Sequence, residues 1–288
     1  MNFPDTANIR SWLVQYFSES VIQSPLFELL LEMQRQMGFD ASSSVEISKK
    51  IIGKREYLDR LNFLYANRLT ERYHTCMKFL DNSERNTGVN LDTAQTLALV
   101  MDEDPTNLTQ VVTGLDLRPE PGQSRFKVWF EFTNAAKLIE RTFKQLGYYQ
   151  KVKEYIVINE LLLGFGFYPD GRSEIKAHLN YGEFRHAIRA KLKLCNLFEK
   201  RVFDAFDWSD PLYLCFRGKE PRIFIYFCHT DVEELLGCLK LDEIPREILL
   251  LNEQKPDIFG AYYDELLKRS LHEYNLYYQL KMPVLESI

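Results

Sequence analysis

Apolar and polar residues alternate along residues 160–181 in the way that predicts a β-hairpin. The first arm is apolar and aromatic and ends in the sequence GFGFY at residues 164–168. Pro169, Asp170 and Gly171 supply the fixed φ and the positive φ that a tight reversal needs. Because successive side chains of a strand point to opposite sides, the second arm has two faces. One carries Ser173, Ile175, Ala177 and Leu179, and the other carries Glu174, Lys176, His178 and Asn180.

Four further pairs of segments repeat this alternation. They are residues 44–51 with 57–65, 109–118 with 124–133, 212–216 with 222–228, and 259–267 with 272–280. Along residues 124–133 one face is Phe126, Val128, Phe130 and Phe132, and the other is Arg125, Lys127, Trp129 and Glu131. The pattern predicts five strand pairs, each with an apolar face that helices would cover.

Apolar residues at helical spacing occupy the sequence between the strand pairs. Ser24-Pro25 is typical of a helix start, and Asn134 and Asp231 stand where helix caps are expected. The predicted helices cover residues 5–37, 66–81, 91–100, the stretch after Asn134, 182–206, the stretch after Asp231, and 245–251. Within 182–206 one side of the predicted helix carries Phe184, Ile188, Leu192, Cys195 and Phe198.

The polar faces of the predicted strands are unusually rich in basic and aromatic residues. They include Glu46, Lys50, Arg60, Asn62, Lys127, Trp129, Glu174, Lys176, His178, Arg217, Arg222, Tyr226, Asn275 and Tyr277. An open sheet would leave such a face in water. A closed barrel would turn it into a polar lumen and would also leave no strand edge unpaired. The composition of these faces favours the barrel, with about ten antiparallel strands ringed by α-helices, an α+β fold.

Composition excludes several classes of protein. The 288 residues are 45% hydrophobic and 27% charged, as in ordinary globular proteins, and suffice for one large domain or two small ones. A net charge of -5 argues against nucleic acid as a partner. Five scattered cysteines without CxxC spacing predict reduced thiols in a cytoplasmic protein. No apolar run of about 18 residues predicts a membrane span, and the N-terminal sequence does not resemble a secretion signal.

Several motifs, in order along nearly the whole chain, resemble the cyanobactin prenyltransferases, the F enzymes of ribosomal cyclic-peptide pathways. The most specific is residues 164–168 (GFGFY) followed by 170–175 (DGRSEI). The others are Val45-Glu46, residues 114–119 (GLDLRP), residues 126–129 (FKVW) and residues 276–278 (LYY). The resemblance implies a single ABBA-type prenyltransferase domain over residues 1–288, acting as a monomer.

The resemblance also implies an activity. Such enzymes transfer an isoprenyl group from an allylic diphosphate donor to an electron-rich side chain of a peptide, here Tyr, Trp, Arg or a similar residue. Dimethylallyl diphosphate is the expected donor, because the large Trp129 would shorten the donor pocket. The resemblance implies Mg²⁺ held through the diphosphate oxygens and waters, since the sequence itself offers no DDxxD run or other metal site.

Cations are needed to bind the diphosphate and to stabilise it as it leaves. Lys127, Lys176, Arg222 and Arg60 are the predicted ligands, with Arg55 and Arg217 as weaker candidates. Lys127 and Lys176 each lie mid-strand between apolar neighbours, which places them on the predicted lumen face. The alternative for both is an exposed strand lysine, and for Arg217 a solvated turn residue.

Aromatic faces shield an allylic cation from water, and a carboxylate accepts the proton of the acceptor. The predicted shield consists of Trp129, Tyr226, Tyr277, Tyr213 and Phe224, with core packing as the alternative for each. Glu46 is the predicted catalytic base, because the family's acceptor-side glutamate lies in this early strand. Glu174 is the alternative catalytic carboxylate, although it could simply pair with Lys176.

Two positions depart from the family pattern. Relatives often have Lys-x-His where this chain has Lys127-Val128-Trp129, and often have Arg where this chain has Asn275. Two diphosphate contacts are therefore lost or replaced. The alternative hypothesis is a catalytically impaired family member that acts as a peptide- or small-molecule-binding barrel.

Overall fold

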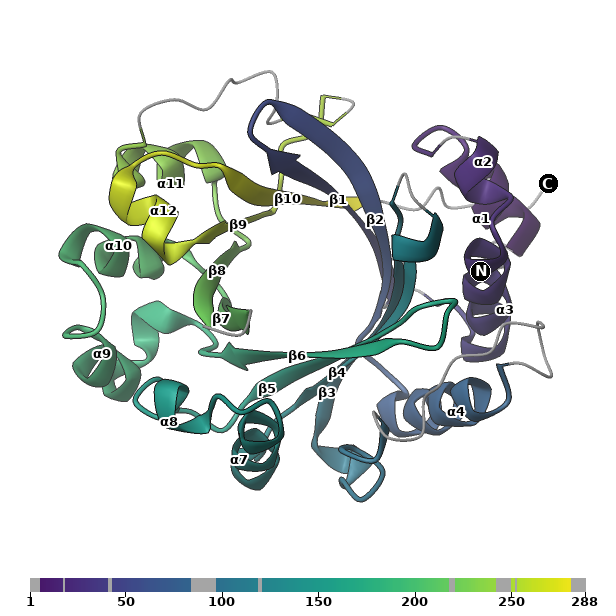
Figure 1. The fold of residues 1–288 in the computed structure, drawn as a ribbon, viewed down its shortest axis with the longest axis horizontal. Helices are drawn as coiled ribbons and strands as arrows, with labels where there is room; N and C mark the ends of the chain where they lie inside the picture. Colours follow the sequence, from purple (N-terminus) through teal and green to yellow (C-terminus); the bar gives the residue numbers. More distant parts are fainter. Residues whose placement is uncertain are drawn as a thin grey trace.

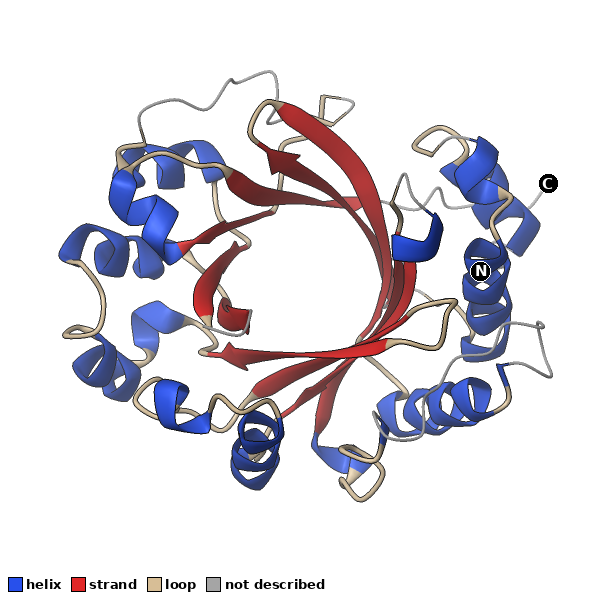
Figure 2. Ribbon diagram, in the orientation of Figure 1, coloured by secondary structure: helices blue, strands red, loops and turns tan. Residues whose placement is uncertain are grey.

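Ten antiparallel strands close into a barrel in the computed structural model of this chain (Figure 2). The structure describes residues 6–17, 19–40, 43–83, 97–118, 121–217, 221–241, 250–251 and 253–280. The strands are β1 (Ser43–Ile52), β2 (Arg55–Tyr65), β3 (Leu108–Asp116), β4 (Arg125–Phe132), β5 (Leu161–Phe167), β6 (Ser173–Asn180), β7 (Leu212–Arg217), β8 (Arg222–Cys228), β9 (Ile258–Tyr262) and β10 (Glu273–Leu280). Each strand pairs with its neighbours in sequence, and β1 pairs with β10 to close the barrel. The predicted barrel of ten antiparallel strands is confirmed.

Helices surround the barrel on its outer side (Figure 1). The α-helices are α1 (Thr6–Leu13), α2 (Glu19–Ile22), α3 (Pro25–Met37), α4 (Leu69–Asp81), α7 (Ala136–Gln145), α8 (Tyr149–Val152), α9 (Ile188–Leu194), α10 (Lys200–Ala205), α11 (Val232–Leu239) and α12 (Tyr263–Lys268). Ser24 caps α3 by accepting from the amide of Phe27, and Asp231 caps α11, both as predicted. Among the described residues, no helix has the length and apolar character to cross a membrane.

The hydrophobic core lies between the outer face of the barrel and the helices. Phe126, Val128, Phe130 and Phe132 of β4 are at most 1% exposed and belong to this core. The Phe130 ring meets Tyr73 of α4 edge-on, with 5.1 Å between ring centroids. The predicted register is therefore correct. The phenylalanines face outward to the helices, and the alternating polar residues face the lumen.

Three local predictions are wrong, and they concern Asn134, residues 259–267 and residues 182–206. Asn134 does not cap α7, because it adopts a positive φ of 53° in the preceding turn, and α7 has no side-chain cap at Ala135. The strand predicted over residues 259–267 ends at Tyr262, and α12 follows, since the sequence DELLK at residues 264–268 favours helix.

The long helix predicted over residues 182–206 is broken. It consists of α9, α10 and two 3₁₀ turns, Phe184–His186 and Phe206–Trp208. Ile188 and Leu192 are each 72% exposed, whereas Phe184 and Phe198 are buried, so the predicted common side does not pack as one face. Most of the helices predicted at residues 91–100 and 245–251 lies outside the described residues.

Candidate active site

The lumen of the barrel contains a cavity of about 160 Å³, room for on the order of ten water molecules. Residues from both charged and aromatic parts of the lumen line it. They include Glu46, Arg60, Asn62, Asp116, Lys127, Trp129, Lys176, His178, Tyr213, Arg217, Tyr226, Cys228, His229 and Tyr277. The cavity therefore combines cations, carboxylates and aromatic rings in one space.

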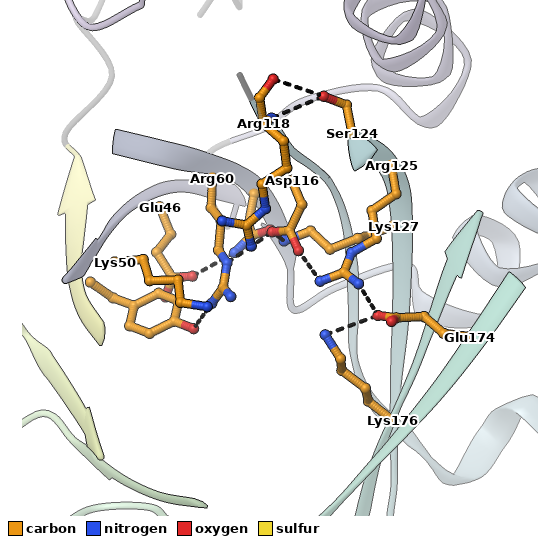
Figure 3. A network of polar contacts seen from close by, with 12 residues as sticks. Glu46, Lys50, Arg60, Asp116, Arg118, Ser124, Arg125, Lys127, Glu174 and Lys176 are labelled. Carbon is orange, nitrogen blue, oxygen red and sulfur yellow. Dashed lines mark hydrogen bonds and ion pairs between the residues drawn. The ribbon is translucent and has the colours of Figure 1, made fainter. Parts of the chain in front are cut away.

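Asp116 is the centre of an ion-pair network at one end of the cavity (Figure 3). It lies at the end of β3 and is 1% exposed. Its carboxylate is 2.8 Å from Arg60 Nε and 2.9 Å from Lys127 Nζ, and it also pairs with Arg125. Burial would raise the pKa of Asp116, but these three cations hold it well below its usual range. Asp116 is thus ionised and surrounded by positive charge.

Glu174 is the second anion of this network. It pairs with Arg125, lies 2.9 Å from Lys176 Nζ, and accepts a hydrogen bond from the Tyr168 hydroxyl at 3.2 Å. Burial opposes ionisation of Glu174, but Lys176 and Arg125 outweigh it and lower the pKa of the carboxyl group. The Glu174 carboxylate therefore positions these two cations, and Glu174 is not among the residues that line the cavity.

Positive charge exceeds negative charge at this end of the lumen. Burial lowers the pKa of Lys127 to about 8 and that of Lys176 to about 7, and neighbouring arginines add to both effects. Arg217 contacts the Tyr226 hydroxyl and lies 4.0 Å from the centre of the Phe224 ring. Among the described residues it forms no ion pair with a carboxylate, yet it lies within electrostatic range of Arg60 and Lys176. Such an arrangement suits the binding of an anion.

Aromatic side chains line the lumen next to the cation cluster. The Trp129 ring meets His178 edge-on at 4.8 Å, and Tyr226 meets Tyr277 edge-on at 5.9 Å. Two glycines make room for these rings. A Cβ atom at Gly164 would lie 2.2 Å from Trp129 ring carbons, and one at Gly260 would lie 2.9 Å from the Tyr226 ring. The wide aromatic surface thus depends on cross-strand glycines.

Glu46 lies on the same cavity and is 5% exposed. Asn62 Nδ2 donates a hydrogen bond to its carboxylate at 2.7 Å. Burial raises the pKa of Glu46 to about 7, although the bond from Asn62 and the charges of Lys127 and Arg60 oppose this shift. A carboxyl group with this pKa can accept and release a proton near neutral pH.

The structure brings most of the predicted residues together around one cavity. Those lining it are Glu46, Lys127, Lys176, Arg60, Trp129, Tyr226, Tyr277, Tyr213 and the weaker candidate Arg217. Phe224 packs below the Arg217 guanidinium and is not among the lining residues.

Arg222 and Arg55 are not brought to this cavity. Arg222 lies at the start of β8, pairs with Asp264 of α12 at 2.8 Å, and stacks on Tyr262 with 3.8 Å to the ring centre. Arg55 is exposed at the start of β2. Alternation along β8 places Arg222 on the same side as the residues that face the lumen. Because Arg222 lies at the very start of the strand, its guanidinium group reaches α12 instead.

The sequence analysis assigned no role to Asp116 or Arg125, which lie at the centre of this network. The sequence does indicate that Asp116 faces the lumen, because Gly114 and Asp116 alternate with the apolar Leu115 in β3. A single carboxylate on a strand gives no sign of how many cations surround it, because those cations come from β2 and β4.

No group of three or more His, Cys, Asp or Glu side chains among the described residues could hold a metal ion. The oxygens of Asp116 and Glu174 are already engaged with Arg60, Arg125, Lys127 and Lys176. These residues therefore do not fit a Mg²⁺ site held by the protein itself.

The fold and the site define a barrel protein with a cationic and aromatic lumen. Residues 9–280 match the family described as "Family of unknown function (DUF5838)", and the chain belongs to this family. No curated protein matches the chain.

Solved structures with some similarity carry prenyltransferase names. One is described as "6-dimethylallyl tryptophan synthase", with 14% identity over 81% of this chain and 79% of that chain, and a TM-score of 0.46. Another is described as "Crystal structure of NotF prenyltransferase", with 14% identity over 96% of each chain and a TM-score of 0.45.

Proposed function

We propose that this chain is a prenyltransferase, a single-domain enzyme that moves an isoprenyl group from an allylic diphosphate to a nucleophilic acceptor. One observation carries the proposal. An excess of buried cations, a wall of aromatic rings and a carboxyl group with a pKa near neutrality line the same cavity. These are the three groups that the reaction needs.

The cation cluster is the proposed diphosphate site. Arg60, Lys127, Lys176 and Arg217 line the cavity and would donate charge-assisted hydrogen bonds to the phosphate oxygens. The bond between the isoprenyl carbon and its oxygen breaks, and the electron pair leaves with the diphosphate. Fixed positive charge stabilises that developing anion without rearrangement.

The aromatic wall is the proposed shield of the allylic cation. Trp129, Tyr213, Tyr226 and Tyr277 line the same cavity as the cation cluster. Ring faces attract a cation, and rings packed against it would leave less room for water that could capture it.

Glu46 is the proposed base. The acceptor nucleophile attacks the allylic carbon, and its proton passes to the Glu46 carboxylate, which Asn62 holds in place at 2.7 Å. Glu174 acts on the cations instead, because its oxygens are engaged by Arg125 and Lys176.

The finer proposal rests on the sequence motifs. Their resemblance to the cyanobactin prenyltransferases supports dimethylallyl as the transferred group and a ribosomally made peptide as the acceptor. Under this proposal, Mg²⁺ would be held by the donor's diphosphate oxygens and by waters, and not by side chains of the protein. We also propose that the enzyme works as a monomer in the cytoplasm.

The alternative, a barrel that binds but does not transfer, is favoured by one observation. Asn275, where relatives often have Arg, is fully buried, and its side-chain oxygen can accept from Arg60 Nη1 at 3.2 Å. This position therefore contributes no cation to the diphosphate site.

Mass spectrometry would test the proposal and identify the acceptor. The protein is incubated with dimethylallyl diphosphate, Mg²⁺ and peptides bearing Tyr, Trp, Arg, His, Ser or Thr. A mass increase of one dimethylallyl group on a peptide supports transfer. Binding of a non-hydrolysable allylic diphosphate by calorimetry, without transfer to any peptide, would support the binding barrel.

Lys127→Ala and Lys176→Ala are each expected to reduce kcat/KM for the donor by about 10–150-fold. This corresponds to ~1.5–3 kcal/mol for a hydrogen bond to a charged group. Lys200→Ala is the matched control, since Lys200 pairs with Asp204 on the surface of α10. Wild-type kinetics in both lumen variants would remove these lysines from the donor site.

Trp129→Ala is expected to raise the rate ratio of geranyl to dimethylallyl transfer by about tenfold or more, because it removes a ring that fills the lumen against Gly164. Steady-state rates with both donors measure the ratio. Trp208→Ala, which alters an exposed tryptophan, should leave the ratio unchanged. An unaltered ratio in Trp129→Ala would show that Trp129 does not set donor length.

A further inference from the structure

His178 of β6 is a buried polar side chain with an orphaned nitrogen. It lines the cavity and is 5% exposed, and its Nε2 atom has no hydrogen-bond partner among the described residues. Leaving a buried polar atom unsatisfied is costly, so such atoms are uncommon in folded proteins. The orphaned nitrogen points to a ligand of the cavity.

Three aromatic rings fix the orientation of the imidazole. Tyr226 stacks on it, with 5.2 Å between centroids and 15° between planes. Trp129 and Tyr213 meet it edge-on at 4.8 and 6.4 Å. The ring is therefore held between apolar surfaces, which makes it suitable for directed hydrogen bonding.

His178 lies between the cation cluster and the aromatic rings of the lumen. Lys176 precedes it by two residues on the same face of β6, about 7 Å along the strand. Cys215 of the neighbouring strand β7 pairs with His178. Arg217 lies two residues further along β7, on the same face as Cys215. An anion bound between Lys176 and Arg217 would therefore have oxygens close to the imidazole.

We propose that His178 is a further ligand of the donor's diphosphate and donates its Nε2–H to the oxygen that leaves the isoprenyl carbon. This inference rests on the proposed function. The leaving oxygen is favoured over the other oxygens because it joins the charged group to the apolar chain. His178 occupies the corresponding boundary in the protein, beside Lys176 on one side and Trp129 on the other.

The charge state of His178 suits this role. Burial, Arg217, Lys176 and Arg60 together hold the pKa of His178 well below its usual value. The imidazole is therefore neutral in the free protein and adds no repulsion to the cation cluster. The Tyr213 and Tyr226 hydroxyl groups are the other titratable groups on the rings around it. A bound diphosphate would offset the nearby cations and raise this pKa, so donor binding would favour uptake of a proton by His178.

Calorimetric titration with inorganic pyrophosphate tests the contact directly. His178→Phe keeps an aromatic ring but removes the donor, and we expect its affinity for pyrophosphate to fall by about tenfold or more. His178→Gln keeps an N–H group and should retain most of the affinity. His186→Gln is the control, because His186 is exposed and lies within the short turn Phe184–His186.

Nuclear magnetic resonance of ring-labelled histidine gives a second measurement, in which pyrophosphate is titrated into the wild-type protein. The His178 signal, assigned by its loss in His178→Gln, should shift on saturation with pyrophosphate, and the His186 signal should not. A His178 signal that stays unchanged at saturation, or wild-type affinity in a folded His178→Phe, would overturn the assignment. If the wild-type protein binds neither pyrophosphate nor dimethylallyl diphosphate, the proposed function fails together with this inference.

Discussion

Glu46→Gln is expected to slow isoprenyl transfer by about 10²–10⁴-fold while donor affinity changes little. Glutamine keeps the shape of the side chain and can still contact Asn62, but it cannot accept a proton. Donor affinity should persist because the diphosphate site consists of cations on other strands, among them Lys127 and Lys176. Single-turnover transfer to the acceptor and calorimetric binding of the donor separate the two effects.

The pH dependence of transfer gives Glu46 a distinct signature. A base acts in its deprotonated form, and the pKa of Glu46 is about 7. The rate should therefore rise with pH through about 7 in the wild-type enzyme, and Glu46→Gln should lose this rise. Glu174→Gln provides the comparison and should keep the rise, since Glu174 holds Arg125 and Lys176. Wild-type rates in both variants on the true acceptor would show that neither carboxylate acts as the base.

Asp116→Asn is expected to destabilise the fold by about 3–5 kcal/mol, as when one partner of a buried ion pair is removed. The change leaves Arg60, Arg125 and Lys127 close together without the carboxylate that they share. Urea unfolding measures the free energy of unfolding. Because the remaining cations would bind an added anion, saturating pyrophosphate should stabilise Asp116→Asn more than the wild-type protein.

A surface ion pair provides the control for Asp116. Asp264→Asn removes the carboxylate that pairs with Arg222, and both side chains are more than 40% exposed. Its cost should lie within about 1 kcal/mol, the range for exposed pairs. A similar small cost for Asp116→Asn would mean that the network does not contribute to stability in the proposed way.

The alternation of apolar and polar residues was sufficient to predict the strands and the lumen face. Lys127 and Lys176 were placed correctly because each lies between two apolar neighbours, and strand geometry leaves only one side for the charge. Periodicity failed at Tyr262, where the aromatic pattern continues while the backbone turns from β9 into α12. Local sequence there supports both structures, and contacts of the folded protein decide between them.

The arrangement of the charges could not be read in the same way. Arg60, Asp116 and Glu174 are far apart in sequence and belong to one network, linked through Arg125, only because the barrel brings β2, β3 and β6 around one lumen. The contrast between Arg217 and Arg222 depends on α12, which offers Asp264 to Arg222. Which cation remains available to an anion is therefore a property of the closed structure.

Closure of the barrel between β1 and β10 also has a consequence for folding during synthesis. Val45 pairs with Leu280 and Ile52 pairs with Glu273. The outer edge of β1 therefore stays unpaired until β10 has emerged from the ribosome. Until then β1 presents an edge of unpaired backbone groups to the surroundings, a state that favours association between nascent chains. The high contact order of this pairing makes closure a late and slow step. Charged side chains on β1 and β10, such as Lys49, Lys50 and Glu273, help to keep the unpaired strand edges soluble before closure.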